Sequence, residues 1–280
     1  NLPVVDLGTG RTAKAIAAGS DHTCAILDNA SIKCWGANAS GQLGLGDTNN
    51  RGDGSASGGM GDYLPTVDLG PGRTAKVIAT GGSHTCVILD NESVKCWGFN
   101  DKGQLGQGDS VSRGDGSNEM GDNLTAIDLG SGRTATAITA GDEHTCALLD
   151  NASVKCWGEN SYGQLGQGDT DDRGDGSASG GMGDSLPAVE LGSGRTATSI
   201  TIGTGYTCVL LDDNSVKCWG RGHYGQLGNE KGATRGDEPD EMGDDLEKVY
   251  LDSNSGDSFL RTATAIAAGN FHTCAIRDNS

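Results

Sequence analysis

The tripeptide Cys-Trp-Gly occurs four times in this chain, starting at residues 34, 96, 156 and 218. All four tryptophans stand in it, and the steps between copies are 62, 60 and 62 residues. Arg-Thr-Ala, Gly-Gln-Leu-Gly and Arg-Gly-Asp recur in constant order around it. Such self-similarity is typical of repeat architectures, in which each unit buries its apolar face only against its neighbours. The 280 residues are therefore one array rather than a set of unrelated domains.

The motifs divide the chain into about four and a half units of about 61 residues. The full units are residues 11–70, 73–130, 133–192 and 195–252. Residues 261–280 match the first part of a unit, and residues 1–10 match the last strand of one. We therefore expect the chain to be a piece of a longer array.

Within each unit the local patterns are those of strands and turns. In the first unit, residues 12–19, 22–27, 31–36 and 64–70 are short apolar or alternating segments bounded by Gly, Asn and Asp. Residues 47–62 are a long polar loop, and no segment repeats its apolar residues every 3.6 positions. Four short strands per unit predict an all-β fold built by radial repetition.

The cysteines of a unit are ten residues apart. A hairpin that turns at residue 29 places residue 24 opposite residue 34, at a Cα separation that a disulfide can span. Zinc ligation and free buried thiols are the alternatives, although zinc ligands usually come in closer pairs. Stable disulfides indicate an oxidising compartment, so we expect the protein outside the cell or on its surface. The predicted pairs are Cys24–Cys34, Cys86–Cys96, Cys146–Cys156 and Cys208–Cys218, which leaves Cys274 without a partner in the chain.

Two stretches of the first unit, read together, resemble the repeat of the RCC1 (regulator of chromosome condensation) family. They are Ala-Gly-x-x-His-Thr-Cys-Ala-Ile-Leu and Ser-Ile-Lys-Cys-Trp-Gly-x-Asn-x-x-Gly-Gln-Leu-Gly-x-Gly-Asp. The resemblance implies a β-propeller with blades of four antiparallel strands, commonly seven to a ring. Four and a half units would then form an incomplete ring or an open superhelical array. The paired cysteines and the long Arg-Gly-Asp loop distinguish the chain from nuclear members and are similar to secreted or surface propellers.

The repeated histidines and tryptophans favour structural roles. One position holds His22, His84, His144 and His272, but Tyr206 in the fourth unit. A catalytic group would not be copied in this way, so we expect these rings to bond neighbouring backbone. We expect the tryptophans to pack between blades, with a sugar-stacking platform as the alternative. No nucleophile elbow, P-loop or zinc-protease motif is present, so we expect a protein that is not an enzyme and has no cofactor.

The polar loops suggest two further hypotheses. Arg-Gly-Asp is the tripeptide read by integrins, but pairing of the arginine with a nearby aspartate is the expectation we favour. The loops beginning at residues 47 and 169 faintly resemble calcium loops, whose ligands are oxygens. Asp47, Asp53 and Asp62 are the candidates for calcium ligands in the first unit.

Asparagines in Asn-x-Ser/Thr sequences are candidates for glycosylation in a secreted protein. Three of them share the predicted hairpin tip, where asparagine also occurs simply as a good turn residue. The candidates are Asn29, Asn38, Asn91, Asn123 and Asn151.

A formal net charge of −18 limits the partners. It repels nucleic-acid phosphates, and no apolar run reaches the length of a membrane span. We expect neither nucleic-acid binding nor membrane insertion. The function we favour is an extracellular repeat scaffold for protein binding or assembly, with partners bound directly or copies joined through the repeat ends. The alternatives are a fibre built from end-to-end repeats and a guanine nucleotide exchange factor or chromatin binder of the RCC1 type.

Overall fold

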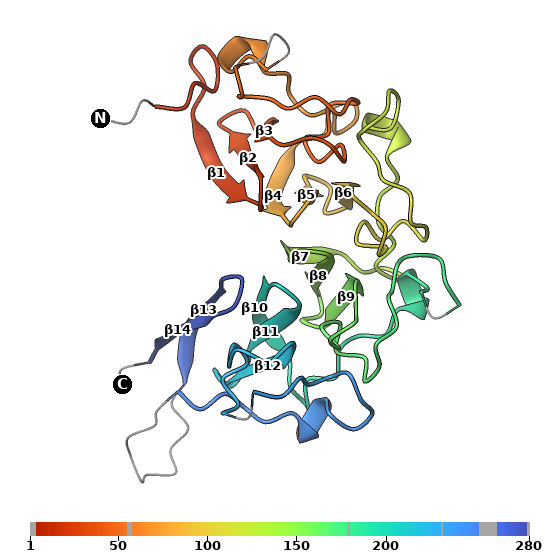
Figure 1. Ribbon diagram of the computed structural model, residues 1–280, viewed down its shortest axis with the longest axis vertical. Helices are drawn as coiled ribbons and strands as arrows, with labels where there is room; N and C mark the ends of the chain where they lie inside the picture. The colour runs from red at the N-terminus through yellow and green to blue at the C-terminus, as the bar shows by residue number, and fades with distance from the viewer. Residues whose placement is uncertain (1–3, 55–57, 179, 231, 252–261, 279–280) are drawn as a thin grey trace.

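Each repeat folds as one small antiparallel sheet, and the sheets follow one another along an open arc (Figure 1). The computed structural model describes residues 4–54, 58–178, 180–230, 232–251 and 262–278. The first blade holds β1 (Ala13–Ala18), β2 (His22–Leu27) and β3 (Ile32–Gly36), and the second holds β4 (Ala75–Thr80), β5 (His84–Leu89) and β6 (Val94–Gly98). The third holds β7 (Ala135–Ala140), β8 (His144–Leu149) and β9 (Val154–Gly158). The fourth holds β10 (Ala197–Gly203), β11 (Tyr206–Leu211) and β12 (Val216–Gly220). A last, two-stranded sheet holds β13 (Ala263–Ala268) and β14 (Thr273–Arg277).

A tight hairpin joins the second and third strands of each full blade, as the sequence predicts. In the first blade His22 pairs with Gly36, Cys24 with Cys34 and Ile26 with Ile32. The tip is an Asx turn, because the side-chain oxygen of Asn29 accepts hydrogen bonds from the amide and the hydroxyl of the Ser two residues later. This local turn fixes the register, and with it the face on which every side chain of the hairpin lies.

The prediction of a fourth strand in each blade is wrong. The amide of Val67 donates to the carbonyl of Ile32 in its own blade (3.0 Å), whereas the carbonyl of Asp68 accepts from Gly121 of the next blade (3.1 Å). Successive backbone groups of this extended segment are therefore shared between two blades, and no continuous ladder forms. Short 3₁₀ helices precede these segments: η1 (Gly61–Tyr63), η2 (Gly121–Asn123), η3 (Gly183–Ser185) and η4 (Gly243–Asp245).

The segment at the start of the described chain makes the same contacts as these extended segments. The carbonyl of Asp6 accepts from Gly61, and that of Leu7 accepts from the Lys33 ammonium (2.9 Å). Asp68 and Leu69 make the equivalent contacts with the second blade. Residues 4–8 thus occupy the place predicted for a closing strand, as an extended segment rather than a strand.

The hydrophobic core lies between consecutive blades, not at one centre. Cys24, Cys34 and Leu43 of the first blade pack against Leu89 and Trp97 of the second. Equivalent residues form the next two interfaces. The inner strands converge on the concave side of the arc, where the turns after β1, β4, β7, β10 and β13 line an open cavity of about 390 Å³. Each blade is therefore held chiefly by its neighbours, as expected for a repeat array.

Candidate functional site

Each full blade is pinned by a disulfide across its hairpin, as predicted. Cys24–Cys34, Cys86–Cys96, Cys146–Cys156 and Cys208–Cys218 are all bonded, each with a Cα separation of 4.1 Å. The paired cysteines face each other directly in the strand register and are almost completely buried. The cystines form part of the surface against which the next blade packs. Each disulfide therefore cross-links the hairpin of its own blade and also contributes packing area to the interface with the next blade.

Replacing Cys86 and Cys96 together by alanine should lower the free energy of unfolding by about 3 kcal/mol. The disulfide closes a short loop, and its loss restores chain entropy to the unfolded state by about that amount. Chemical denaturation of the double variant beside the wild type measures the change. The Cys274→Ala variant is the matched control, because this exposed cysteine is free. Equal stability of the double variant and the control would contradict the structural role of the disulfide.

Three of the tryptophans pack between blades, as predicted. Trp97, Trp157 and Trp219 are fully buried, and each indole N–H donates to the main-chain oxygen of a glutamine in the preceding blade (3.0 Å). These glutamines belong to the repeated Gly-Gln-Leu-Gly motif, whose role the sequence did not reveal. With no exposed ring face, these three indoles cannot form a sugar-stacking platform.

Three of the repeated histidines, His22, His84 and His144, bond across blades to a threonine hydroxyl, so the prediction of a backbone partner is wrong for these three. The Nε2 atoms of His22 and His84 lie 2.9 Å from the hydroxyls of Thr85 and Thr145 in the next blade. The Thr85 hydroxyl already donates to the carbonyl of Gln42 (2.9 Å), so it accepts from His22. The imidazole is therefore the neutral Nε2–H tautomer. Tyr206, which replaces histidine in the fourth blade, does bond backbone, namely the carbonyl of Gly269 (2.9 Å).

Burial keeps these histidines neutral. Desolvation lowers the pKa of His22 to about 4, although Asp21 opposes the shift. It lowers the pKa of His84 and of His144 to about 3, and in His84 the other two histidines add to the effect. These imidazole rings are uncharged, buried and hydrogen-bonded to the next blade, so they link neighbouring blades. Their burial leaves them inaccessible to a bound small molecule.

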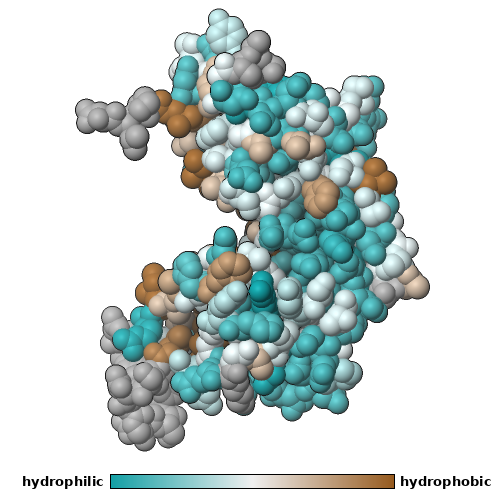
Figure 2. Space-filling view, viewed as in Figure 1, coloured by the Kyte–Doolittle hydropathy of each residue, from teal (hydrophilic) through white to brown (hydrophobic). Residues whose placement is uncertain are grey.

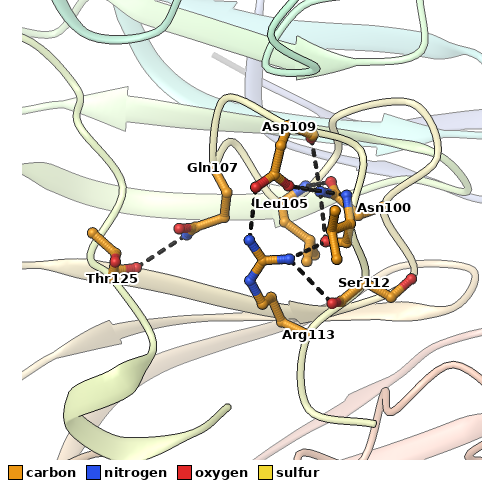
Figure 3. A network of polar contacts seen from close by, with 8 residues as sticks. Asn100, Leu105, Gln107, Asp109, Ser112, Arg113 and Thr125 are labelled. Carbon is orange, nitrogen blue, oxygen red and sulfur yellow. Dashed lines mark hydrogen bonds and ion pairs between the residues drawn. The ribbon is translucent and has the colours of Figure 1, made fainter. Parts of the chain in front are cut away.

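The arginine of the Arg-Gly-Asp motif is turned inward, which confirms the expected pairing. Arg113 donates to the carboxylate of Asp109 (2.7 Å) and to the carbonyl of Val111 (2.7 Å), while Asn100 binds Asp109 from the other side (Figure 3). The backbone of Arg113 forms an isolated antiparallel bridge with Gly98. Arg51 and Arg173 make equivalent ion pairs at 2.6 Å and are only 7% exposed, whereas Arg235 pairs with Glu241. This geometry withholds the guanidinium from an adhesion receptor.

The three calcium candidates have separate surroundings. Asp47 bonds Arg51 and Asn38. Burial raises the pKa of Asp47, but the hydrogen bonds from Arg51, the Asn49 amide and Asn38, with the charge of Arg51, together lower it. The Thr9 hydroxyl and amide lower the pKa of Asp62 by bonding its carboxylate. Asp53 is exposed and also takes part in an interaction. Across the described parts of the chain, no three His, Cys, Asp or Glu side chains are grouped so as to hold a metal ion. Calcium binding stays a prediction that the geometry does not support.

The glycosylation candidates differ in access. Asn29, Asn91 and Asn151 lie exposed at hairpin tips, and Asn123 is exposed in η2. Asn38 is completely buried, because its amide donates to the carbonyl of Asp47 (2.7 Å) and its oxygen accepts from Leu43. The Asn38 candidate is therefore wrong, since the folded chain offers no space for a glycan there.

One side of the array carries variable residues on a constant backbone, a feature that the sequence alone did not reveal. In each blade the residue after Cys-Trp-Gly donates its amide to the carbonyl of the residue before His or Tyr, at 2.8–2.9 Å. The end of the third strand and the start of the second strand therefore have the same backbone geometry in every full blade. We call this side the loop face; it comprises residues 37–40, 99–102, 159–162 and 221–224 with the turns 20–21, 82–83, 142–143, 204–205 and 270–271.

The side chains of the loop face change from blade to blade. The residue after Cys-Trp-Gly is Ala37, Phe99, Glu159 or Arg221, although the strands on either side are nearly identical copies. An alignment of the repeated units would reveal these variable positions. Only the structure shows that their loops lie on the same side of the array. The fold is therefore a constant scaffold whose variable positions are partly exposed in loops, the segments that commonly carry binding residues.

Models of the regulator of chromosome condensation (RCC1) repeat match this chain between residues 13 and 226. One matches residues 13–42, 76–104, 135–164 and 197–226, and another matches 34–88, 93–148 and 153–210. Together they span most of the four full blades.

Curated relatives are similar over parts of their length. The ultraviolet-B receptor UVR8 of Arabidopsis thaliana is 28% identical over 81% of this chain and 45% of its own length. A protein RCC2 homolog of Xenopus laevis is 31% identical over 56% of this chain and 28% of its own. The chain thus spans less than half of the relatives that it matches here.

Solved structures of the same architecture superpose well at low identity. Human WBSCR16 covers 96% of this chain with a TM-score of 0.68 and 16% identity, and 58% of that protein is matched. Yeast RCC1 (Prp20), in its complex with Kap60, covers 95% with a TM-score of 0.65 and 18% identity, and 54% of it is matched. At these identities the likeness concerns the fold alone. Among the described residues, no helix has the length and apolarity required to cross a bilayer.

Proposed function

Because the chain belongs to the RCC1 repeat family, we propose that it is a non-enzymatic, extracellular scaffold that binds a protein partner through its loop face. The observation that carries the proposal is the combination of a disulfide in each full blade with a loop face whose side chains vary. A rigid surface loses little conformational entropy on binding. Structural disulfides persist in oxidising surroundings, which supports a location outside the cell.

The RCC1-like proteins of known structure include protein binders. Yeast RCC1 (Prp20) has been crystallised bound to Kap60, and Prp20p from Saccharomyces cerevisiae has binding properties toward Gsp1p and histones. For the present chain, exchange-factor activity is the less favoured alternative, because disulfides are rare in the reducing interior of the cell. Enzymatic activity has no support in the buried histidines, which are bonded to the next blade.

Affinity capture from extracellular fluid, with loop-face variants, tests the proposal. The wild-type chain should retain a protein that a Phe99→Ala/Glu159→Ala variant retains less well, since both residues lie on the loop face. The Lys76→Ala/Glu92→Ala variant is the control, because that ion pair lies toward the opposite, hairpin-tip ends of the strands. A partner that binds both variants equally well would use another surface, and the absence of any captured protein would contradict the proposed function.

Assembly of copies is a second candidate, supported by exposed apolar side chains of the described residues. Val4, Ile16 and Ile276 are 94%, 68% and 66% exposed, and Figure 2 shows hydrophobic residues toward the open side of the arc. A cavity of about 230 Å³ beside Leu227 is also lined by apolar side chains. Heterologous contacts between such surfaces build filaments when they do not close. Sedimentation at increasing concentration should then reveal growing species, and a constant monomer would exclude this candidate.

A further inference from the structure

The loop face carries a cluster of aromatic side chains around one arginine. The Arg221 guanidinium lies 5.1 Å from the centre of the Tyr162 ring, 5.4 Å from that of Tyr224 and 5.7 Å from that of Phe271. The rings of Tyr224 and Phe271 also meet edge to face at 5.2 Å. These residues come from three successive repeats, so the cluster exists only in the folded array.

The aromatic rings are exposed although they are held in place. Tyr224 is 66% exposed and Phe271 is 44% exposed. Stacking on three rings fixes the arginine, and the rings in turn lose freedom before any partner arrives. Exposed Tyr and Phe beside Arg are the residue types enriched in the centres of protein interfaces. The first two blades have no such cluster, because the residues corresponding to Tyr224 are Ser40 and Lys102.

Beside the aromatic cluster, the same face is acidic. Burial raises the pKa of Glu143, and the carboxylates of Glu159, Asp101 and Asp142 raise it further, against the opposing effect of Lys102. Lys102 is itself engaged with Asp172 at 3.8 Å. Glu159 and Tyr162 belong to the same short loop, so the acidic and aromatic parts are continuous. A partner with positive charges would relieve this repulsion between carboxylates.

We propose that this part of the loop face, formed by Asp142, Glu143, Glu159, Tyr162, Tyr224 and Phe271, binds a basic protein segment that contains an aromatic residue. The inference rests on the proposed function and names the kind of partner. The aromatic side chain of the segment packs against Tyr224 and Phe271, and its lysines or arginines pair with the carboxylates of the third blade. Arg221 holds the rings and does not act as the binding charge.

A short synthetic peptide with lysines on both sides of one tryptophan is the probe. Fluorescence anisotropy of the labelled peptide should show saturable binding to the wild-type chain. The Tyr224→Ser/Phe271→Ser variant should bind at least about tenfold more weakly, because central aromatic residues each contribute more than about 1 kcal/mol. The Glu143→Gln/Asp142→Asn variant should also bind more weakly, and added salt should weaken binding to the wild type.

Two matched variants distinguish binding at this surface from nonspecific electrostatic attraction of the basic peptide to an acidic protein. Tyr63→Ser removes an aromatic residue that is 87% exposed outside the loop face, and Glu92→Gln removes a carboxylate at a hairpin tip. Both should bind the peptide like the wild type. The far-ultraviolet circular dichroism spectrum of the Tyr224→Ser/Phe271→Ser variant should match that of the wild type, which would show that this variant is folded.

Three results would overturn the inference. They are equal binding of a peptide with glycine in place of tryptophan, equal binding of a peptide with glutamates in place of lysines, and unchanged affinity of the Tyr224→Ser/Phe271→Ser variant. If a captured natural partner binds the chain but ignores Tyr224→Ser/Phe271→Ser, the inference fails while the proposed function stands. If no protein is captured by the wild type, the proposed function itself fails.

Discussion

Trp157→Ala should lower the free energy of unfolding by about 3–5 kcal/mol, the usual cost of emptying a buried aromatic site. The indole is completely buried between the second and third blades, where it packs with Leu105 and the Cys86–Cys96 cystine. The carbonyl of Gln104 loses the indole N–H but keeps the Thr145 hydroxyl, so the loss is chiefly one of packing. Urea unfolding followed by far-ultraviolet circular dichroism measures the change.

Trp35→Ala is the internal control for this prediction. Trp35 stands in the same motif but remains partly exposed, outside the core clusters of the described array. Its removal should therefore cost clearly less than that of Trp157. Equal losses for the two variants would show that the tryptophan acts within its own hairpin and not between blades.

Lowering the pH from 7 to 5 should destabilise the fold by about 2 kcal/mol for each of His22, His84 and His144. In the unfolded chain these histidines titrate near pH 6.5, but in the folded chain burial holds their pKa values at about 4, 3 and 3. Below pH 6.5 the unfolded state thus binds more protons. The stability is complete above that pH and is lost progressively as the pH falls toward 3. Denaturant unfolding at a series of pH values measures this slope.

The fourth blade supplies the control for the acid effect. Tyr206 occupies the histidine position there, next to Gly203, and the third blade has Gly141 at the corresponding place. The variant His144→Tyr should therefore fold and should lose about 2 kcal/mol less than the wild type between pH 7 and pH 5. If the dependence of the unfolding free energy on pH were unchanged in this variant, His144 would not contribute to the loss of stability in acid.

Local features of the fold could be predicted because their partners are close in sequence. Cys86 and Cys96 belong to one hairpin and lie equally far from its turn at Asn91, so their spacing predicts that they face each other. The same reasoning located the outward-facing Asn91. The recurrent motifs likewise predicted the number of blades, since each copy must form the same unit.

Contacts between blades could not be predicted in this way. The partner of His84 is Thr145, in another repeat, and the extended segment around Val67 divides its hydrogen bonds between two blades. Asn38 fits a glycosylation sequence, but the loop that returns to Asp47 buries it. The Arg221 cluster depends on residues from three repeats, which only the curvature of the array brings together.

Mapping the thiols of the protein taken from its natural source tests the central claim most directly. Alkylation without reduction, followed by peptide mass spectrometry, should find Cys24, Cys86, Cys146 and Cys208 each linked to the cysteine ten positions later. Those eight cysteines should take up label only after reduction. Full labelling of them in the unreduced protein would contradict a disulfide-pinned scaffold that works outside the cell.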